Sequence, residues 1–248
     1  KFMSKLIIDT TLNYSPNFNL KKRKPKDIKF IIFHYTGMKK ENQAITRLTN
    51  NKSKVSSHYF IKNNGEVITL VPELHISWHA GISSWQNYKS INKYSIGIEI
   101  SNPGHENKYK KFSKKQIYSI LKLSKYLIKK YKIKFEFILG HSDIAPLRKK
   151  DPGEKFPWKK LAKSKLSQWH NMDEKKLKKK RLILLKSGEE GIFFRNLKKI
   201  GYPKISQKKY NIKKKSLVKA FQRRFRQKLI NGIIDQECLI ISNNLLKS

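Results

Sequence analysis

Three short apolar runs of strand length constrain the fold of this chain more than any other feature. IKFIIFH (28–34), SIGIEIS (95–101) and FEFILGH (135–141) are rich in β-branched or aromatic residues and lie between polar segments, as buried β-strands do. Residues 58–72 form two further β-rich runs around an Asn-Asn-Gly sequence, which is typical of a hairpin turn. We therefore expect a central sheet, with 95–101 as a central strand.

Helical patterns alternate with these runs. Residues 114–131 carry apolar side chains at i, i+3, i+4 and i+7 spacing, which predicts a long amphipathic helix. Residues 44–50 have helical spacing, and a short helix is expected to begin at Pro157-Trp158. The polar segment 1–26 contains two prolines and is expected to be extended. This order predicts an α/β fold, in which helices flank a mixed central β-sheet.

The charge run DEKKLKKKR (173–181) marks the best domain boundary, and a solvated linker or helix face is its expected structure. Three helical patterns follow, at 190–203, 216–227 and 236–246. They predict a small C-terminal three-helix domain. The expected organisation is an N-terminal extension (1–24), a main domain (25–168), a basic linker (169–180) and the helical domain (181–248).

Charge is the most unusual property of the composition. The 248 residues include 57 Lys and Arg against 17 Asp and Glu, a net charge of +40, which suggests a polyanionic partner. The excess is spread over both halves and consists mostly of Lys, whereas Arg is the better reader of phosphates and guanine edges. We therefore do not expect a nucleic-acid partner, and part of the charge can equally reflect an AT-rich coding sequence.

Features that the sequence lacks argue against several other classes of protein. It contains no apolar run of 18 residues, so no transmembrane helix is expected. Its start does not read as a secretory signal, which is expected to be absent or already removed. The single cysteine, Cys238, excludes an intrachain disulfide framework and a multi-cysteine zinc site.

Two histidines stand at the ends of predicted strands. His34 closes FIIFH and His141 closes FILGH, and Asp151 follows in a proline-containing loop. Catalytic zinc sites use three His or carboxylate ligands and leave one position for water, so these three residues are candidates. Their spacing matches no short zinc motif, and on the residues alone surface or core roles remain the commoner interpretation.

Five segments together resemble a known family. FIIFHYTG, VSSHYFIKNNGEV, WHAG, SIGIEI and GHSDIAPLRKKDPGEKFPW resemble the zinc-dependent N-acetylmuramoyl-L-alanine amidases of the AmpD type (amidase family 2), which are related to the peptidoglycan recognition proteins. The resemblance covers about residues 25–165, in family order. It implies a zinc enzyme that hydrolyses the amide bond between the muramoyl lactyl group and L-alanine in peptidoglycan or muropeptides, during cell-wall turnover or recycling.

The resemblance also implies roles for individual residues. His34, His141 and Asp151 match the ligands of one Zn²⁺, Glu99 matches the catalytic glutamate, and Lys149 matches the catalytic lysine. Glu99 interrupts an apolar run, where a charge without a partner is costly.

Four further residues are candidate substrate contacts. Trp78 and His79 lie in the WHAG segment, although packing is an equally open role for Trp78. Asn102 follows Glu99 closely. His58 lies on a predicted strand, where burial is favoured over a position facing the cleft.

The C-terminal region resembles the three-helix peptidoglycan-binding domain through EGIFFRNLKKIGYP, AFQRRFR and NGIID. The alternative is a basic helical module that only packs on the main domain. The expected partners are peptidoglycan or anhydro-muropeptides, and we expect a monomer in the bacterial envelope or periplasm. The lack of a signal leaves the cytoplasm open. The alternative function is a non-catalytic protein that binds muropeptides or peptidoglycan.

Overall fold

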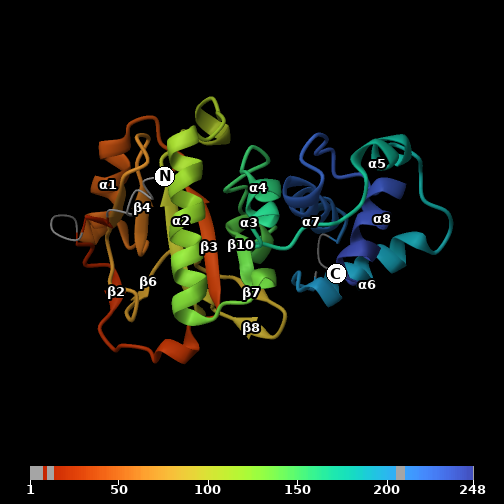
Figure 1. The fold of residues 1–248 in the computed structure, drawn as a ribbon. Coiled ribbons are helices and arrows are strands. Elements are labelled where there is room, and N and C mark those ends of the chain that lie inside the picture. The colour runs from red at the N-terminus through yellow and green to blue at the C-terminus, as the bar shows by residue number, and fades with distance from the viewer. Residues whose placement is uncertain (1–7, 10–13, 205–209, 248) are drawn as a thin grey trace.

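A six-stranded sheet forms the centre of the computed structural model, which describes residues 8–9, 14–204 and 210–247 (Figure 1). The strands lie in the order β1-β5-β4-β9-β3-β10. In that order they are β1 (Ile8–Asp9), β5 (Val67–Thr69), β4 (Tyr59–Ile61), β9 (Ser95–Ile100), β3 (Phe30–Tyr35) and β10 (Ile138–Gly140). The predicted mixed sheet is confirmed, with β9 as a central strand.

Pairing within the sheet is mostly parallel. β3 lies parallel to β9 and to β10, and β4 lies parallel to β9. The exception is β4 with β5, an antiparallel hairpin that turns at Gly65, whose φ of +86° suits glycine. The predicted hairpin is therefore confirmed.

The last predicted strand is shorter than expected. Residues 135–141 were expected to be one strand, but Phe135–Phe137 form a 3-10 turn in which the Phe137 N–H donates to the Lys134 carbonyl at 3.0 Å. The strand covers Ile138–Gly140 alone, and His141 begins the short helix α3 (His141–Ile144). The apolar run alone does not reveal these two local turns.

Helix α2 (Lys114–Tyr131) lies across one face of the sheet, as Figure 1 shows, with the bounds predicted from its pattern. Ser113 caps its first turn, since its hydroxyl accepts from the Gln116 N–H. The buried stripe runs through Ile120, Leu123 and Leu127, which pack on Ile31 and its neighbours.

Strand residues alternate between the two faces of the sheet. Ile31 and Phe33 face α2, whereas Phe30 and Ile32 belong to a cluster on the opposite face. A third cluster packs α1 (Glu41–Thr49) onto β4 and β5. Two small ribbons complete the main body: β2 (Phe18–Asn19) with β6 (Ile76–Ser77), and β7 (Ser84–Trp85) with β8 (Tyr88–Lys89).

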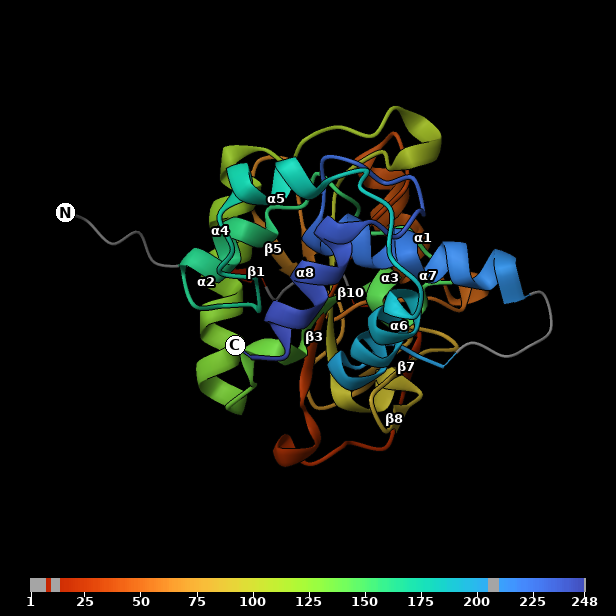
Figure 2. The ribbon, with the colours of Figure 1, turned by 90° about the vertical axis from the view of Figure 1, so that its right-hand side faces the viewer.

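The C-terminal helices gather at one end of the molecule, next to β10 (Figures 1 and 2). They follow α4 (Trp158–Lys163) and are α5 (Glu174–Lys180), α6 (Glu189–Ile200), α7 (Tyr210–Phe225) and α8 (Gln236–Leu245). The predicted helices are confirmed, and α5 lies entirely within the charge run at 173–181, with Leu177 buried.

These helices share a core with the sheet. Phe193 and Phe221 belong to the same buried cluster as Phe30 and Leu139. The C-terminal helices are thus packed on the main body, so the chain does not consist of two bodies joined only by a linker.

Two expectations remain, one for the N-terminal extension and one for membrane-spanning helices. The extension predicted over 1–24 falls partly on residues 1–7 and 10–13, which lie outside the described residues. Its described part packs closely, since Arg23 is buried and donates to the Glu73 carbonyl. Within the described ranges, no helix is long and apolar enough to cross a membrane.

Candidate metal and catalytic site

The sheet register places the first two functional side chains next to each other. β3 and β9 are parallel, and His34 pairs with Glu99 near the carboxyl ends of both strands. Directly paired residues of neighbouring strands present their side chains on the same face. Gly140 pairs with Phe33 on the other side of β3, so His141, the next residue, also reaches this edge.

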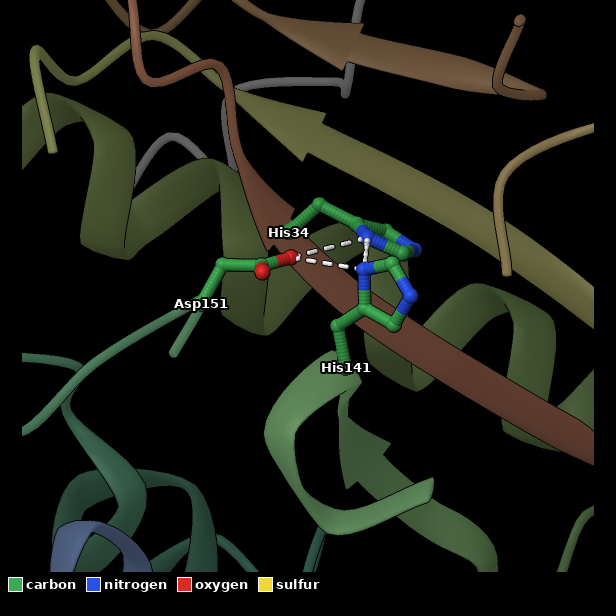
Figure 3. Close-up of side chains that lie close together, drawn as sticks. All are labelled: His34, His141 and Asp151. Carbon is green, nitrogen blue, oxygen red and sulfur yellow. Dashed lines mark hydrogen bonds and ion pairs between the residues drawn. The ribbon is translucent and has the colours of Figure 1, made fainter. Parts of the chain in front are cut away.

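Three potential ligand atoms converge at this edge (Figure 3). The Nδ1 atoms of His34 and His141 lie 2.9 Å apart, and each lies 3.0 Å from Oδ2 of Asp151. All three residues are buried. The Asp151 carbonyl accepts from the Ser142 N–H at 2.8 Å, which ties the loop of Asp151 to the turn of His141.

Backbone carbonyls determine the tautomer of both histidines. His141 Nε2 lies 3.1 Å from the Ala80 carbonyl, which can only accept, and 3.3 Å from Arg148 Nη2, which can only donate. The two protons of that Nη2 go to the Ala80 and Ile82 carbonyls, so the proton is assigned to His141 Nε2 and the lone pair to Nδ1.

The tautomer of His34 is determined through two intervening residues, Ser95 and His79. The Ser95 hydroxyl donates to the Ile91 carbonyl, so it accepts from His79 Nε2 at 3.0 Å. His79 Nδ1 is then an acceptor for the Nε2 proton of His34, also at 3.0 Å. His34 Nδ1 is therefore unprotonated as well.

The donor set fits a divalent metal ion. Two imidazole lone pairs and one carboxylate oxygen point at a common centre, which is repulsive unless a cation lies between them. Burial and the neighbouring His141 lower the pKa of His34 to about 4, so it is neutral at pH 7. Burial alone would raise the pKa of Asp151, but His141 and His34 outweigh it and hold that pKa below its ordinary value. His34 and Asp151 are thus in their ligating form at neutral pH.

Glu99 lies beside this centre. Its Oε2 is buried, and no hydrogen-bond partner for it occurs among the residues that the structure describes. Burial, followed by repulsion from Asp151, raises the pKa of Glu99 to about 8, and Lys149 opposes this rise. Both residues line a cavity of about 370 Å³ that the three candidate ligand residues also line.

The four expected substrate contacts occupy different positions. Trp78 lines the cavity, and its Nε1 donates to Asn19 Oδ1 at 2.7 Å. His79 also borders the cavity, but its two ring nitrogens are used by His34 and Ser95, so the structure gives it a positioning role.

His58 and Asn102 are buried away from the cavity lining. The nitrogens of His58 contact the Gly97 N–H, Ser77, Arg23 and a backbone carbonyl, and its side chain is fully buried. Asn102 donates to the Lys110 carbonyl and accepts from the Gly104 N–H. Neither residue is placed to contact a substrate, because these structural bonds occupy their polar atoms.

Two arginines were not anticipated from the sequence. Arg47 on α1 lines the cavity, and nothing in its local pattern distinguishes it from a surface residue of the helix. Arg148 donates to the Ala80 and Ile82 carbonyls and so holds the segment that contacts His141. The sequence signal that could have identified Arg148 was its position just before Lys149 in the last of the five family segments, GHSDIAPLRKKDPGEKFPW.

Comparison with known proteins agrees with this geometry. Residues 24–154 match the family model described as N-acetylmuramoyl-L-alanine amidase. The chain is 33% identical over 235 residues to N-acetylmuramoyl-L-alanine amidase AmiD of Escherichia coli K12, covering 89% of this chain and 83% of AmiD. It is 30% identical over 177 residues to 1,6-anhydro-N-acetylmuramyl-L-alanine amidase AmpD of Haemophilus influenzae, covering 64% of this chain and 94% of AmpD.

Solved structures agree over both parts of the chain. The complex of AmiD from E. coli with anhydro-N-acetylmuramic acid-L-Ala-D-γ-Glu-L-Lys matches with a TM-score of 0.77 at 33% identity, covering 89% of each chain. AmpDh3 from Pseudomonas aeruginosa matches with a TM-score of 0.76 at 26% identity, covering 94% of this chain and 96% of that one. The chain therefore belongs to the N-acetylmuramoyl-L-alanine amidase family.

Proposed function

We propose that this amidase is a zinc enzyme whose single Zn²⁺ is held by His34, His141 and Asp151. The observation that carries the proposal is the convergence of three unprotonated donor atoms beside Glu99, whose buried Oε2 has no hydrogen-bond partner among the described residues. Two imidazoles and one carboxylate form a ligand set typical of catalytic zinc. When bound, zinc supplies a Lewis acid that polarises the amide carbonyl and lowers the pKa of a bound water toward about 7.

Glu99 has the role of general base and acid. In the metal-free protein burial raises the pKa of Glu99 to about 8, and a cation held by the three ligands would lower that pKa and favour the carboxylate that a general base needs. It takes the proton of the attacking water and gives it to the nitrogen of L-alanine as the amide bond breaks. Lys149, which lines the same cavity, stabilises the negative charge that develops on the carbonyl oxygen.

The proposed substrate is the amide bond between the muramoyl lactyl group and L-alanine, in anhydro-muropeptides and in the intact wall. AmiD, whose fold matches over most of both chains, has been solved with an anhydro-muramoyl tripeptide. The protein side of the site comes from one chain, so a monomer suffices.

We further propose that residues 181–248, with the basic segment 169–180, retain the enzyme on the wall in the bacterial envelope. A second hollow, of about 310 Å³, lies within this region, and Lys159 is the one lining residue that it takes from the main domain 25–168. Trp169, Lys178 and Lys228 line it, together with the carboxylates of Glu174 and Glu237. An aromatic face beside cations suits a sugar that carries anionic stem-peptide carboxylates, and the net charge of +40 acts in the same direction.

The test is release of stem peptide from a defined anhydro-muropeptide and from purified wall sacculi, followed by chromatography. Activity should disappear with a chelator and return with zinc. Saturable binding of muropeptide without turnover, in protein saturated with zinc, would instead support the non-catalytic alternative. Turnover that a chelator does not affect would refute the metal mechanism.

A further inference from the structure

A buried ion pair joins the C-terminal helices to the turn that carries His141. Asp143, the third residue of α3, is fully buried, and Arg224 on α7 is 2% exposed. Arg224 Nη1 donates to Asp143 Oδ2 at 2.8 Å. The hydroxyl of Tyr202, just after α6, donates to Oδ1 of the same carboxylate at 2.8 Å. Two residues from the C-terminal region thus hold one carboxylate of the main domain.

Asp143 in turn holds the start of the helix that presents His141. Its Oδ2 also accepts the Gly140 N–H at 2.8 Å, which caps the helix one residue before His141. In the same turn, the Ser142 N–H donates to the Asp151 carbonyl. Asp143 therefore determines the geometry of a turn that contains His141 and is hydrogen-bonded to the backbone of Asp151.

Arg224 is itself held in one orientation. Its Nη2 donates to the Ile138 carbonyl on β10 at 2.9 Å, and its guanidinium lies 4.2 Å from the ring centre of Trp158. A carboxylate that is 0% exposed needs a cation, because an unpaired buried charge is strongly destabilising. The ion pair thus links β10, α3 and α4 to α7.

We propose that Arg224 and Tyr202 are positioning residues of the metal site, so the C-terminal helices are a structural part of the active centre. The segment that matches the amidase family model ends at residue 154, before both of them. They act through Asp143, which orients the turn of His141. The inference rests on the proposed zinc ligands. The experiment below distinguishes failure of the ligand assignment from failure of the positioning role.

The experiment measures the zinc dissociation constant of the full-length, metal-stripped protein by competition with a chromophoric chelator. Wild-type protein that binds no zinc would refute the ligand assignment, independently of Arg224. If wild type binds, Arg224→Met should weaken zinc binding by roughly 10- to 100-fold, the range typical of residues that orient metal ligands. Tyr202→Phe, which removes one hydrogen bond and leaves the ion pair, should weaken it less.

Arg226→Met is the matched control. Arg226 is a second buried arginine of the same region, but its ion pairs are with Asp235 and Glu237, within the C-terminal residues. The Arg226→Met substitution should lower the free energy of unfolding and leave the zinc affinity near that of wild type. Equal loss of zinc affinity in both arginine variants would overturn the proposal, because general loosening of the helices would then explain it.

A double-mutant cycle decides whether Arg224 acts through Asp143. Asp143→Asn removes the buried charge that Arg224 neutralises, so in the Arg224→Met background it should restore part of the zinc affinity. If the fold-losses of zinc affinity in the two single variants simply multiply in the double variant, the proposed coupling is overturned. If Arg224→Met does not fold, the same cycle with Tyr202→Phe and Asp143→Asn gives the test, with the same criterion.

Discussion

Replacing Glu99 by Gln should make the metal-free protein more stable and the zinc-loaded protein nearly inactive. The substitution keeps the shape of the side chain and removes its charge. Glu99 Oε2 has no partner among the described residues, so the change costs that atom no hydrogen bond. The folded protein therefore loses an ionisable group whose charge Lys149 offsets only in part.

The size of the effect follows from the pKa. Burial raises the pKa of Glu99 from 4.5 to about 8, so the folded state binds this proton more tightly than the unfolded chain does. Between pH 4.5 and 8, wild-type stability therefore falls as pH rises, by about 1.4 kcal/mol per pH unit from this one group. At pH 7 the difference between Glu99→Gln and wild type should reach about 3 kcal/mol, and at pH 4.5 it should nearly vanish.

The assay is urea unfolding of metal-stripped wild type and variant at pH 4.5 and pH 7, followed by tryptophan fluorescence. Glu136→Gln, on the 3-10 turn before β10, is the control for the same substitution outside the site. With zinc restored, Glu99→Gln should lose about 10²- to 10⁴-fold in turnover, the usual contribution of a general base. Equal stability of the variant and wild type at pH 7, or retained turnover, would refute the reasoning.

Three further outcomes are expected. His79→Phe removes the acceptor that sets the tautomer of His34, and should weaken zinc binding by roughly 10- to 100-fold in a chelator competition. Burial lowers the pKa of His170, so wild type should lose stability relative to His170→Gln as pH falls below 6.5, by up to about 1.4 kcal/mol per unit in urea unfolding. Sedimentation with sacculi should weaken as salt rises, whereas turnover of small muropeptides should change much less; equal sensitivity would place the effect of charge in the active site.

The sequence predicted most of the fold because its signals are local. The apolar runs around residues 30, 59 and 96 each determine a strand without reference to distant residues, and the stripe at 114–131 determines α2. The candidate ligand trio was predicted from strand ends and family motifs, and the structure places His34 and His141 at one edge of the sheet.

The remaining features depend on contacts between distant segments. The chain of hydrogen bonds from Ile91 through Ser95 and His79 to His34 joins three parts of the sequence, so the WHAG motif alone suggested a substrate contact for His79. Asp143 and Arg224 are 81 positions apart, and no local pattern predicts their pairing. For the same reason, the shared core of the sheet and the C-terminal helices was not expected from the charge run between them.

The metal content of the purified protein tests the central claim most directly. After loading with zinc and removal of excess metal, elemental analysis should give one zinc per chain for wild type. His141→Ala should bind much less zinc, since it removes one of three ligands. Wild type without zinc, or His141→Ala with a full equivalent of tightly bound zinc, would contradict the account.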